Sequence, residues 1–312
     1  MKNFILDVDT GVDDAFALMF AARHPEINLI GVTCVDGNTN LNQVVINTLK
    51  VLDAAEAKEI PVAAGAARPL IDEPRYAEHV HGADGLADLG TPESTRVVDK
   101  RPAVELLRDL IEQSKDPVTL IPLAPLTNIA LFLRAFPETA KKLERIVLMG
   151  GSAGAGNATA TAEFNIWHDP ESAAIVFNSG VPITMYGLDV FMDLRMNESH
   201  SSELITSGHA PSIFGGRLIK SMFDRLNHEI TLGDYGAVAT ALYPELTKTE
   251  RFRVTVDTTF GPNRGMTVCD RRPLFIQELD PGFETSAFVD VVLEIDVDAI
   301  RNLWIKAITT DQ

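Results

Sequence analysis

The sequence predicts an α/β protein whose central sheet is mostly parallel and has helices on both faces. Short apolar runs, typical of buried strands, alternate with longer segments of helical periodicity through the first half of the chain. Such alternation places strands parallel to one another, with the connecting helices covering both faces of the sheet. No stretch has the composition of an interdomain linker, and no internal repeat is visible. We therefore predict one domain spanning residues 1–312.

The predicted elements follow one another closely from the amino terminus. The first strand is the apolar run 4–6, and a helix is expected at 15–22. Further strands are expected at 27–33, 60–63, 118–121, 146–149, 182–187, 253–268 and 288–295. Further helices are expected at 42–55, 102–113, 126–135, 169–177 and 298–308, with a largely helical region at 201–230. A long polar loop is expected at 78–86, and loops of that kind often carry function.

Composition and charge exclude several classes of protein. The chain has 312 residues, of which 46% are hydrophobic, and a formal net charge of -17. This strong negative charge argues against nucleic acid or an anionic membrane as a partner. No apolar run reaches the length of a membrane span, and a strand begins too early for a signal peptide. The two cysteines, Cys34 and Cys269, lack metal-ligand spacing. We expect a cytoplasmic protein with reduced cysteines.

An acidic stretch follows the first predicted strand. Asp7 and Asp9 lie at the strand end, Gly11 permits a tight turn, and Asp13 and Asp14 open the next helix. Open α/β sheets bind ligands at this edge. A helix cap explains one of the last two carboxylates but not the convergence of all four, because like charges raise one another's pKa. A hard cation would remove this conflict, and the lack of nearby Cys or His favours calcium or magnesium over zinc.

Two further groups of polar residues stand beyond predicted strands. The glycine-rich segment 150–156 does not have GxGxxG spacing, so we reject a dinucleotide site there. Asn157, Glu163 and Asn165 follow it, and amide and carboxylate groups of this kind suit a polyhydroxylated ligand such as a sugar. Asp234 precedes a small-residue helix, where an Asp is usually a cap.

Taken together, these motifs resemble the inosine–uridine-preferring nucleoside hydrolases. The stretch from Asp7 to Asp14 is similar to the DxDxGxDD signature of that family. The resemblance covers nearly the whole chain in order, through Gly37-Asn38, His81-Gly82, Pro125-Leu126-Thr127-Asn128, Met149-Gly150-Gly151, Ala162-Glu163-Phe164-Asn165, Asp169-Pro170-Glu171, Gly187-Leu188-Asp189, Asp234 and Arg264-Gly265-Met266-Thr267.

The resemblance implies a Rossmann-like domain that hydrolyses the N-glycosidic bond of ribonucleosides with the help of calcium, releasing ribose and a free base. It implies that Asp9, Asp14, Asp234 and the backbone carbonyl of Leu123 hold the metal. It also implies that Asp7 supports these ligands without binding the metal itself. Asp9, beside the attacking water, is then the expected general base.

The same resemblance implies a set of residues around the substrate and an assembly. The residues expected to line the ribose are Asp13, Asn38, Asn157, Glu163, Asn165 and Asp234. His81 and Trp167 are candidates for contact with the base, although an aromatic beside Phe164 can equally belong to the core. Members of the family are usually homodimers or homotetramers, so we expect self-association here.

One position departs from the family pattern. The best-known subgroup has a His immediately before the last metal-binding Asp, where it protonates the leaving base, and this chain has Gly233. His228 and Tyr235 are nearby alternatives, though each is more often a surface or packing residue. We expect a preference for purine ribonucleosides, or broad specificity, because purines can also be activated by ring protonation or stacking.

Two other functions remain open from the sequence. A magnesium-dependent phosphatase of the haloacid dehalogenase type also has DxD after a strand, but its motif continues Gly-Thr where this chain has Thr10-Gly11. A ribonucleoside- or ribose-binding protein that has lost turnover is the second alternative, suggested by Gly233. The presence of Asp9 and of every expected sugar ligand argues against the loss of turnover.

Overall fold

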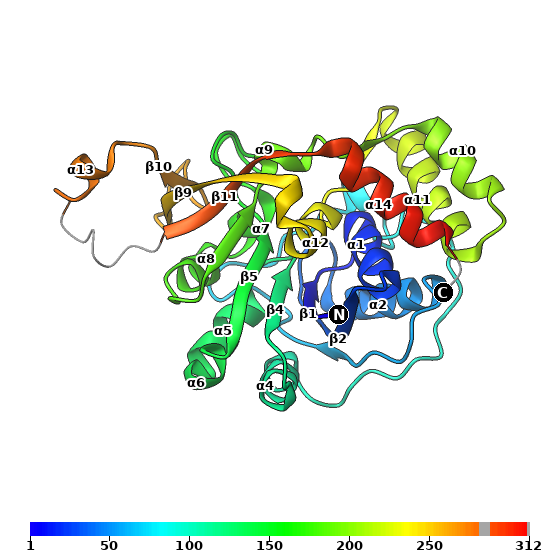
Figure 1. Cartoon of the computed structure of the whole chain (residues 1–312), viewed down its shortest axis with the longest axis horizontal. Coiled ribbons are helices and arrows are strands. Elements are labelled where there is room, and N and C mark those ends of the chain that lie inside the picture. The colour runs from blue at the N-terminus through cyan, green and yellow to red at the C-terminus, as the bar shows by residue number, and fades with distance from the viewer. Residues whose placement is uncertain (281–287, 311–312) are drawn as a thin grey trace.

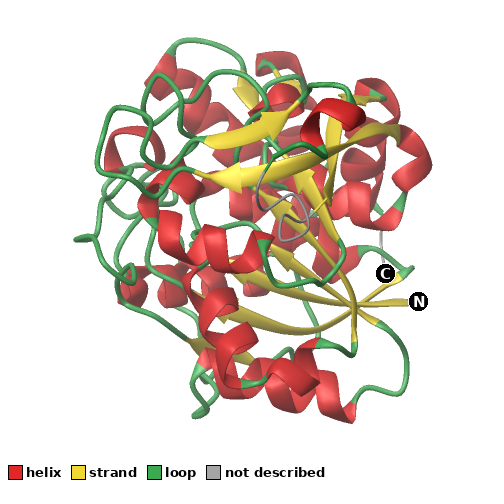
Figure 2. Ribbon diagram, turned by 90° about the vertical axis from the view of Figure 1, so that its left-hand side faces the viewer, coloured by secondary structure: helices red, strands yellow, loops and turns green. Residues whose placement is uncertain are grey.

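The computed structural model describes residues 1–280 and 288–310, in which a nine-stranded sheet has the order β10-β9-β11-β6-β5-β4-β1-β2-β3 (Figures 1 and 2). Its strands are β1 (Lys2–Val8), β2 (Ile27–Cys34), β3 (Val62–Ala64), β4 (Val118–Pro122), β5 (Leu143–Met149), β6 (Ile183–Tyr186), β9 (Thr247–Val256), β10 (Thr267–Asp270) and β11 (Phe288–Ile295). Neighbouring strands from β3 across to β11 pair in parallel, whereas β9 and β10 pair antiparallel at one edge. The predicted mostly parallel sheet is confirmed.

Helices cover both faces of this sheet, as predicted (Figure 1). On one face lie α1 (Val12–Arg23), α2 (Leu41–Ala54), α11 (Ala210–Leu226), α12 (Tyr235–Leu242) and α14 (Val297–Thr309). On the other lie α4 (Ala103–Gln113), α5 (Thr127–Ala135), α7 (Phe164–His168) and α8 (Pro170–Phe177). The remaining elements are α3 (Glu78–His81), α6 (Pro137–Ala140), α9 (Leu188–Phe191), β7 (Arg195–Met196), α10 (Glu198–Thr206), β8 (Ile230–Thr231), η1 (Pro244–Leu246) and α13 (Leu274–Gln277).

The sheet separates two apolar cores, and β1 contributes to both. Phe4 and Leu6 belong to the core beneath α1, whereas Ile5 belongs to the core beneath α4 and α5. This division follows from the geometry of a strand, in which successive side chains point to opposite faces. All three side chains have no exposed surface. A strand buried on both faces is apolar without alternation, as the sequence 4–6 is.

Three segments differ from the predicted structure. Residues 253–268 were expected as one strand, but β9 ends at Val256, residues 257–266 turn, and β10 returns antiparallel to β9. Gly261, Pro262 and Gly265 supply the turn, and Gly265 has φ of +85°. The loop expected at 78–86 begins with the short helix α3. Helix α7 was not predicted, because it is five residues long and depends on a cap by Glu163.

The strand order creates a crevice at the carboxyl edge of the sheet. From β1 the chain proceeds to β2 and β3 on one side, and from β4 it proceeds to β5 and β6 on the other. Connections that leave two adjacent strands in opposite directions open a gap between them, and ligands of open α/β sheets bind there. Asp9 follows β1 and Leu123 follows β4, so both lie at this gap.

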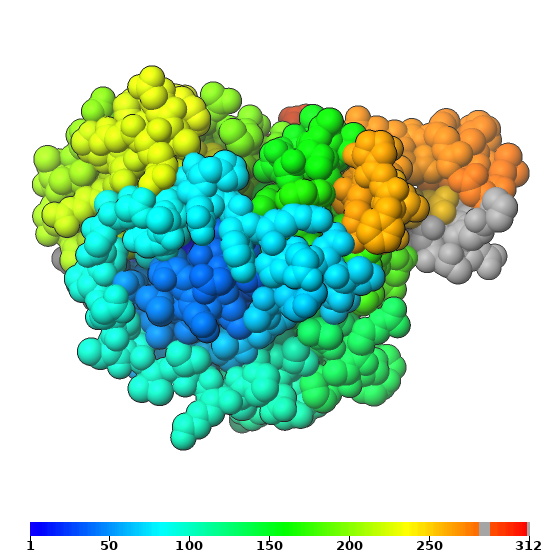
Figure 3. Space-filling view, turned by 180° about the vertical axis from the view of Figure 1, so that it is seen from behind, coloured from blue at the N-terminus to red at the C-terminus, as the bar shows by residue number. Residues whose placement is uncertain are grey.

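The segment between β3 and α4 runs over the surface beside this edge. In Figure 3 it is the cyan chain that passes from the yellow-green residues of α10 and α11 toward the orange residues near 260. Ser221 of α11 donates a hydrogen bond to the Ala87 carbonyl, and Arg264 pairs with Asp72. These contacts fix the segment at two points along its length. Among the described residues, no helix is long and apolar enough to cross a membrane.

Candidate active site

Three carboxylates from two elements meet at the crevice. Oxygens of Asp13, Asp14 and Asp234 all lie within 4.8 Å of one another. Asp13 and Asp14 stand in the first turn of α1, and Asp234 stands immediately before α12. Asp14 has no exposed surface and Asp234 is 3% exposed. Burial raises the pKa of both, and the charge of Asp13 raises each further. Such a cluster is suited to a hard cation, which would offset the repulsion.

Helix capping explains the position of Asp14 but does not explain that of Asp234. Asp14 accepts hydrogen bonds from the backbone N–H groups of Gly11 (2.9 Å) and Asp9 (3.3 Å), so it does satisfy the start of α1. Asp234 makes no side-chain cap bond to α12. The interpretation of Asp234 as an ordinary cap is therefore wrong, and its buried carboxylate needs another partner.

Asp9 lies beside this cluster and has a free oxygen. Its Oδ2 accepts a hydrogen bond from the Asn38 N–H at 2.7 Å, whereas its Oδ1 is buried and has no hydrogen-bond partner among the described residues. Burial, and then the charge of Asp14, raise the pKa of Asp9. A Cβ at Gly37 would stand 2.0 Å from Asp9 Oδ2, which explains the glycine. A buried unpartnered carboxylate oxygen at a cluster of oxygens is consistent with a metal ligand.

Asp7 lies in β1, two residues before Asp9, and hydrogen bonds from neighbouring elements hold its side chain. Its Oδ1 accepts hydrogen bonds from Thr33 Oγ1 (2.5 Å) and Asn128 Nδ2 (2.7 Å), and its Oδ2 is buried without a partner. Burial raises the pKa of Asp7 to about 7. Asn128 also donates to the Cys34 carbonyl and accepts from the Ala66 N–H, so it fixes Asp7 between β1, β2 and α5.

The predicted amide ligands lie on opposite sides of the crevice. Asn38, in the loop after β2, donates from Nδ2 to Asp14 Oδ2 at 3.3 Å. Asn165, on α7, donates to the carbonyl of Leu123 at 3.0 Å. The structure thus brings Asn165 to the carbonyl predicted on the metal. A carbonyl oxygen has two lone pairs, so this hydrogen bond leaves one free.

Glu163 holds the segments around α7 together. Its carboxylate accepts hydrogen bonds from three backbone N–H groups, those of Gly151, Asn165 and Ile166. Asn157, which is exposed, accepts a further hydrogen bond from the Phe164 N–H. Burial raises the pKa of Glu163 to about 7.

This pKa predicts a pH dependence of stability. Glu163 has a folded pKa of about 7 against 4.5 for the free side chain, so its proton is retained longer in the folded protein. Its contribution is fully present below pH 4.5 and is lost as the pH rises through 7. We expect the free energy of unfolding without metal to fall between pH 5 and pH 8, by up to about 3 kcal/mol from this group. Urea unfolding of Glu163→Gln should show a shallower pH dependence than that of wild type. An unchanged slope would contradict the assignment, and Glu59→Gln, at an exposed position, is the control.

His81 is buried against the start of α1. Its Nδ1 accepts a hydrogen bond from the Val12 N–H at 3.2 Å and lies 3.8 Å from Asp13 Oδ1. Burial lowers the pKa of His81. An imidazole that accepts at Nδ1 is neutral and has its proton on Nε2, which leaves one N–H available as a donor.

The other aromatic candidates occupy different surroundings. The Arg75 guanidinium lies 4.0 Å from the centroid of the Trp167 ring, so one face of this ring is covered. The hydroxyl of Tyr235 is buried and donates to the Ile300 carbonyl, so Tyr235 is a packing residue. His228 is exposed, and its Nδ1 lies 2.6 Å from the Glu229 carbonyl.

Gly233 has no room for a side chain, because Phe191 occupies the space. A Cβ there would stand 2.4 Å from the Phe191 Cζ and 3.2 Å from the Asp13 Cβ. The residue also has a left-handed backbone, with φ of +46°. No local signal pointed to Phe191, because it lies far from Gly233 along the chain. A side chain at position 233 would require the Phe191 ring to move.

We therefore expect Gly233→Ala to destabilise the fold. Left-handed strain costs about 1–2 kcal/mol and overpacking about 1–3 kcal/mol. Gly90 is a matched control, because its φ is +63° and nothing lies within 4 Å of an added Cβ. Urea unfolding should show a larger loss for Gly233→Ala than for Gly90→Ala, and Phe191→Leu should reduce the difference. Equal losses would show that Phe191 does not fill this space.

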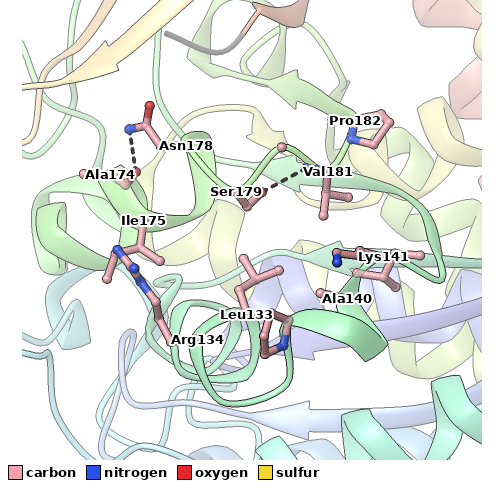
Figure 4. Close-up of a pocket in the computed structure, with 13 residues that line it drawn as sticks. Leu133, Arg134, Ala140, Lys141, Ala174, Ile175, Asn178, Ser179, Val181 and Pro182 are labelled. Atoms are coloured by element: carbon pink, nitrogen blue, oxygen red, sulfur yellow. Dashed lines mark hydrogen bonds between the residues drawn. The ribbon is translucent and has the colours of Figure 1, made fainter. Parts of the chain in front are cut away.

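A large surface groove lies near the amino-terminal ends of the parallel strands, whereas the carboxylate cluster lies near their carboxyl ends. It has a volume of about 750 Å³ and is bordered by Arg134, Lys141, Asn178 and Pro182 (Figure 4). Leu143 and Pro182 stand at the amino-terminal ends of β5 and β6, away from the carboxylates. None of the residues that line the groove is acidic. It takes no part in the cluster described above.

The chain is similar to known proteins over almost its whole length. Residues 4–302 match the family model described as "Inosine-uridine preferring nucleoside hydrolase". Among curated proteins, a pyrimidine-specific ribonucleoside hydrolase RihA of Shewanella baltica is 39% identical over 311 residues, covering 96% of each chain. A pyrimidine-specific ribonucleoside hydrolase RihB of Escherichia coli is 38% identical and covers 86% of this chain and 87% of its own.

Solved structures show the same relationship. A purine-preferring ribonucleoside hydrolase from Gardnerella vaginalis superposes with a TM-score of 0.90 at 31% identity, covering 99% of this chain and 98% of that one. A plant nucleoside hydrolase superposes with a TM-score of 0.92 at 27% identity, covering 99% of both chains.

Proposed function

The chain belongs to the inosine-uridine preferring nucleoside hydrolase family and is an N-ribohydrolase, and we propose that it uses calcium to release ribose and a free base from ribonucleosides. The observation that carries the calcium proposal is the group of three carboxylates at the crevice, two of them buried, together with the unpartnered Asp9 Oδ1. The geometry and the donor types fit a calcium ion, which accepts carboxylate and carbonyl oxygens in a flexible arrangement.

We assign the metal to Asp9, Asp14, Asp234 and the Leu123 carbonyl, with Asp7 fixing β1 behind them. Asp13, whose oxygen lies within the same 4.8 Å group, is assigned to the ribose and is close enough to help compensate the ion's charge. When bound, calcium supplies a coordinated water of lowered pKa and a site for vicinal hydroxyls.

Asp9 is the proposed general base. Its Oδ1 is buried at the carboxylate cluster and has no hydrogen-bond partner among the described residues, so it can receive a proton from a water held there. The Asn38 N–H on Oδ2 fixes the orientation of the group.

The ribose is proposed to lie between the two sides of the crevice. Asn38 approaches from the loop after β2, and Asn165 and Glu163 approach from α7. The proposed sugar ligands are Asp13, Asn38, Asn157, Glu163, Asn165 and Asp234. The carboxylates among them favour the positive charge that develops on the sugar ring as the glycosidic bond breaks.

The base is proposed to leave near His81 and not near position 233. His81 has its proton on Nε2 and lies 3.8 Å from Asp13, one of the proposed ribose ligands. Trp167 remains a candidate for base contact, although Arg75 covers one ring face.

The relatives whose names state a preferred nucleobase do not all prefer the same one. The curated relatives are named pyrimidine-specific, whereas the superposing Gardnerella vaginalis enzyme is named purine-preferring. The more similar of these are the pyrimidine-specific ones, which weighs against a purine preference. We propose broad specificity that includes uridine and cytidine. We also propose a single domain that assembles as a homodimer or homotetramer.

Product analysis tests this proposal. Purified protein with calcium is incubated with uridine, cytidine, inosine, guanosine and adenosine in phosphate-free buffer, and free ribose and free base are quantified. Equimolar ribose and base from at least one pyrimidine ribonucleoside is the expected result. Release from purines alone would overturn the proposed preference, and binding without any release would overturn the proposed turnover.

A further inference from the structure

A second pair of buried charged side chains lies outside the proposed ligand set. His168 Nε2 is 3.4 Å from Asp36 Oδ2, and the two side chains are 0% and 1% exposed. Neither ring nitrogen of His168 has another hydrogen-bond partner among the described residues, nor does Asp36 Oδ2. Each group is therefore a close polar neighbour of the other, and the Tyr76 hydroxyl is a further polar neighbour of Asp36. Buried polar groups are rarely left in this arrangement without a role.

The pair connects the two sides of the crevice. Asp36 lies in the loop that follows β2, and His168 ends α7, which follows β5. In the sheet order β5-β4-β1-β2, the strands β4 and β1 lie between these two segments. The carboxyl ends of β1 and β4 form the floor of the crevice, so the contact between Asp36 and His168 crosses it.

Each partner is close in sequence to a proposed sugar ligand. Asp36 lies two residues before Asn38, whose backbone N–H binds Asp9 and whose side chain binds Asp14. His168 lies three residues after Asn165, on the same side of the helical turn, and Asn165 binds the Leu123 carbonyl. A shift of either segment would therefore move a proposed ribose ligand relative to the carboxylates.

Each of the two segments also has contacts of its own. The loop is fixed at its base by the Asp36 N–H, which donates to the Ala66 carbonyl. Tyr76 lies against Asp36 from the surface segment, and burial followed by the charge of Asp36 raises the pKa of its phenol. On the other side, the Phe164 ring lies 5.7 Å from the His168 ring. Residues 75–77 join the loop and α7 indirectly, because Arg75 donates to the Trp167 carbonyl and the Ala77 N–H donates to the Asn38 carbonyl. The contact between Asp36 and His168 joins the two segments directly.

We propose that Asp36 and His168 are positioning residues that set the separation of Asn38 and Asn165 and so determine how tightly ribose is bound. The inference rests on the proposed function, because it assigns the pair to the ribose site of that reaction. The pair touches neither the proposed metal ligands nor the reacting atoms, so its loss should weaken binding more than it slows the chemical step.

The test uses Asp36→Asn, His168→Asn and the double variant, with kinetics of ribose release measured where each is folded. Each single variant should raise KM by about tenfold, with kcat changed less than about threefold. The double variant should raise KM no more than the worse single one, because groups in direct contact are coupled. Ser201→Ala is the control, since it removes a buried hydrogen bond to Gly216 that involves neither segment. It should lower stability without changing KM.

Backbone amide hydrogen exchange gives a readout that does not need turnover. In the Asp36 and His168 variants, exchange should rise selectively at residues 36–40 and 163–168. A uniform rise over the whole chain, or an unchanged KM in folded protein, would show that the pair only stabilises the fold. If wild type releases no ribose, the proposed function fails, and the exchange pattern alone decides whether the pair joins the two segments.

Discussion

Replacing Asp9 with alanine is expected to lower ribose release by roughly a thousandfold, which is within the range for loss of a general base. The reason is the position of Oδ1, which is buried, unpartnered among the described residues and adjacent to the carboxylate cluster. Ribose release at saturating nucleoside and calcium is the measurement.

Two variants separate this effect from general damage. Asp116→Ala removes an exposed carboxylate and should leave turnover unchanged. Asp9→Asn retains the size of the side chain and an acceptor for the Asn38 N–H, but it cannot take a proton at Oδ1. It should therefore fold like wild type and remain inactive. Near-normal turnover in either Asp9 variant would exclude Asp9 as the base.

Replacing Asp234 with alanine is expected to weaken calcium binding by more than about tenfold, since even residues behind metal ligands contribute that much. Asp234 makes no cap bond to α12, so its removal should cost the helix little. Calorimetric titration of metal-free protein measures the affinity, and the rise in Tm on adding calcium provides a second readout.

Asp296 offers a matched comparison. It also precedes a helix, but its side chain accepts a hydrogen bond from the Ala299 N–H and so caps α14. Asp296→Ala should lower the free energy of unfolding by about 1 kcal/mol and leave calcium binding intact. The two variants should thus give opposite patterns. Unchanged calcium affinity in Asp234→Ala would remove Asp234 from the metal site.

Much of the sheet could be predicted from local sequence, because its inner strands, such as β1 and β4, are buried on both faces. The run 4–6 and the helix after Gly11 are found where they were predicted, since an uninterrupted apolar run and a turn glycine are local signals. Helix α7 was missed because its cap depends on Glu163, and the β9–β10 hairpin was missed because the strand signal continues through its turn.

The residues of the site also divide into those that a local motif predicts and those that depend on contacts between distant parts of the chain. The convergence of Asp9, Asp13 and Asp14 follows from one strand–turn–helix motif, whereas the arrival of Asp234 depends on the placement of α12 beside α1. Asp36, His168 and Phe191 were not predicted as site residues, because their partners lie far away along the chain. Polar residues beside a predicted ligand, as Asp36 is beside Gly37-Asn38, were the available signal.

Family membership decides between the functions that the sequence left open. The match over residues 4–302 and the ribonucleoside hydrolase relatives exclude the haloacid dehalogenase-type phosphatase as the family of this chain. They also support an enzyme in preference to a binding protein.

Calcium add-back to metal-free protein tests the central claim most directly. The protein is treated with chelator, dialysed and assayed for ribose release from uridine and cytidine before and after addition of calcium. We predict negligible release from the metal-free protein and full recovery with calcium. Undiminished release from protein shown to contain no metal would contradict the account.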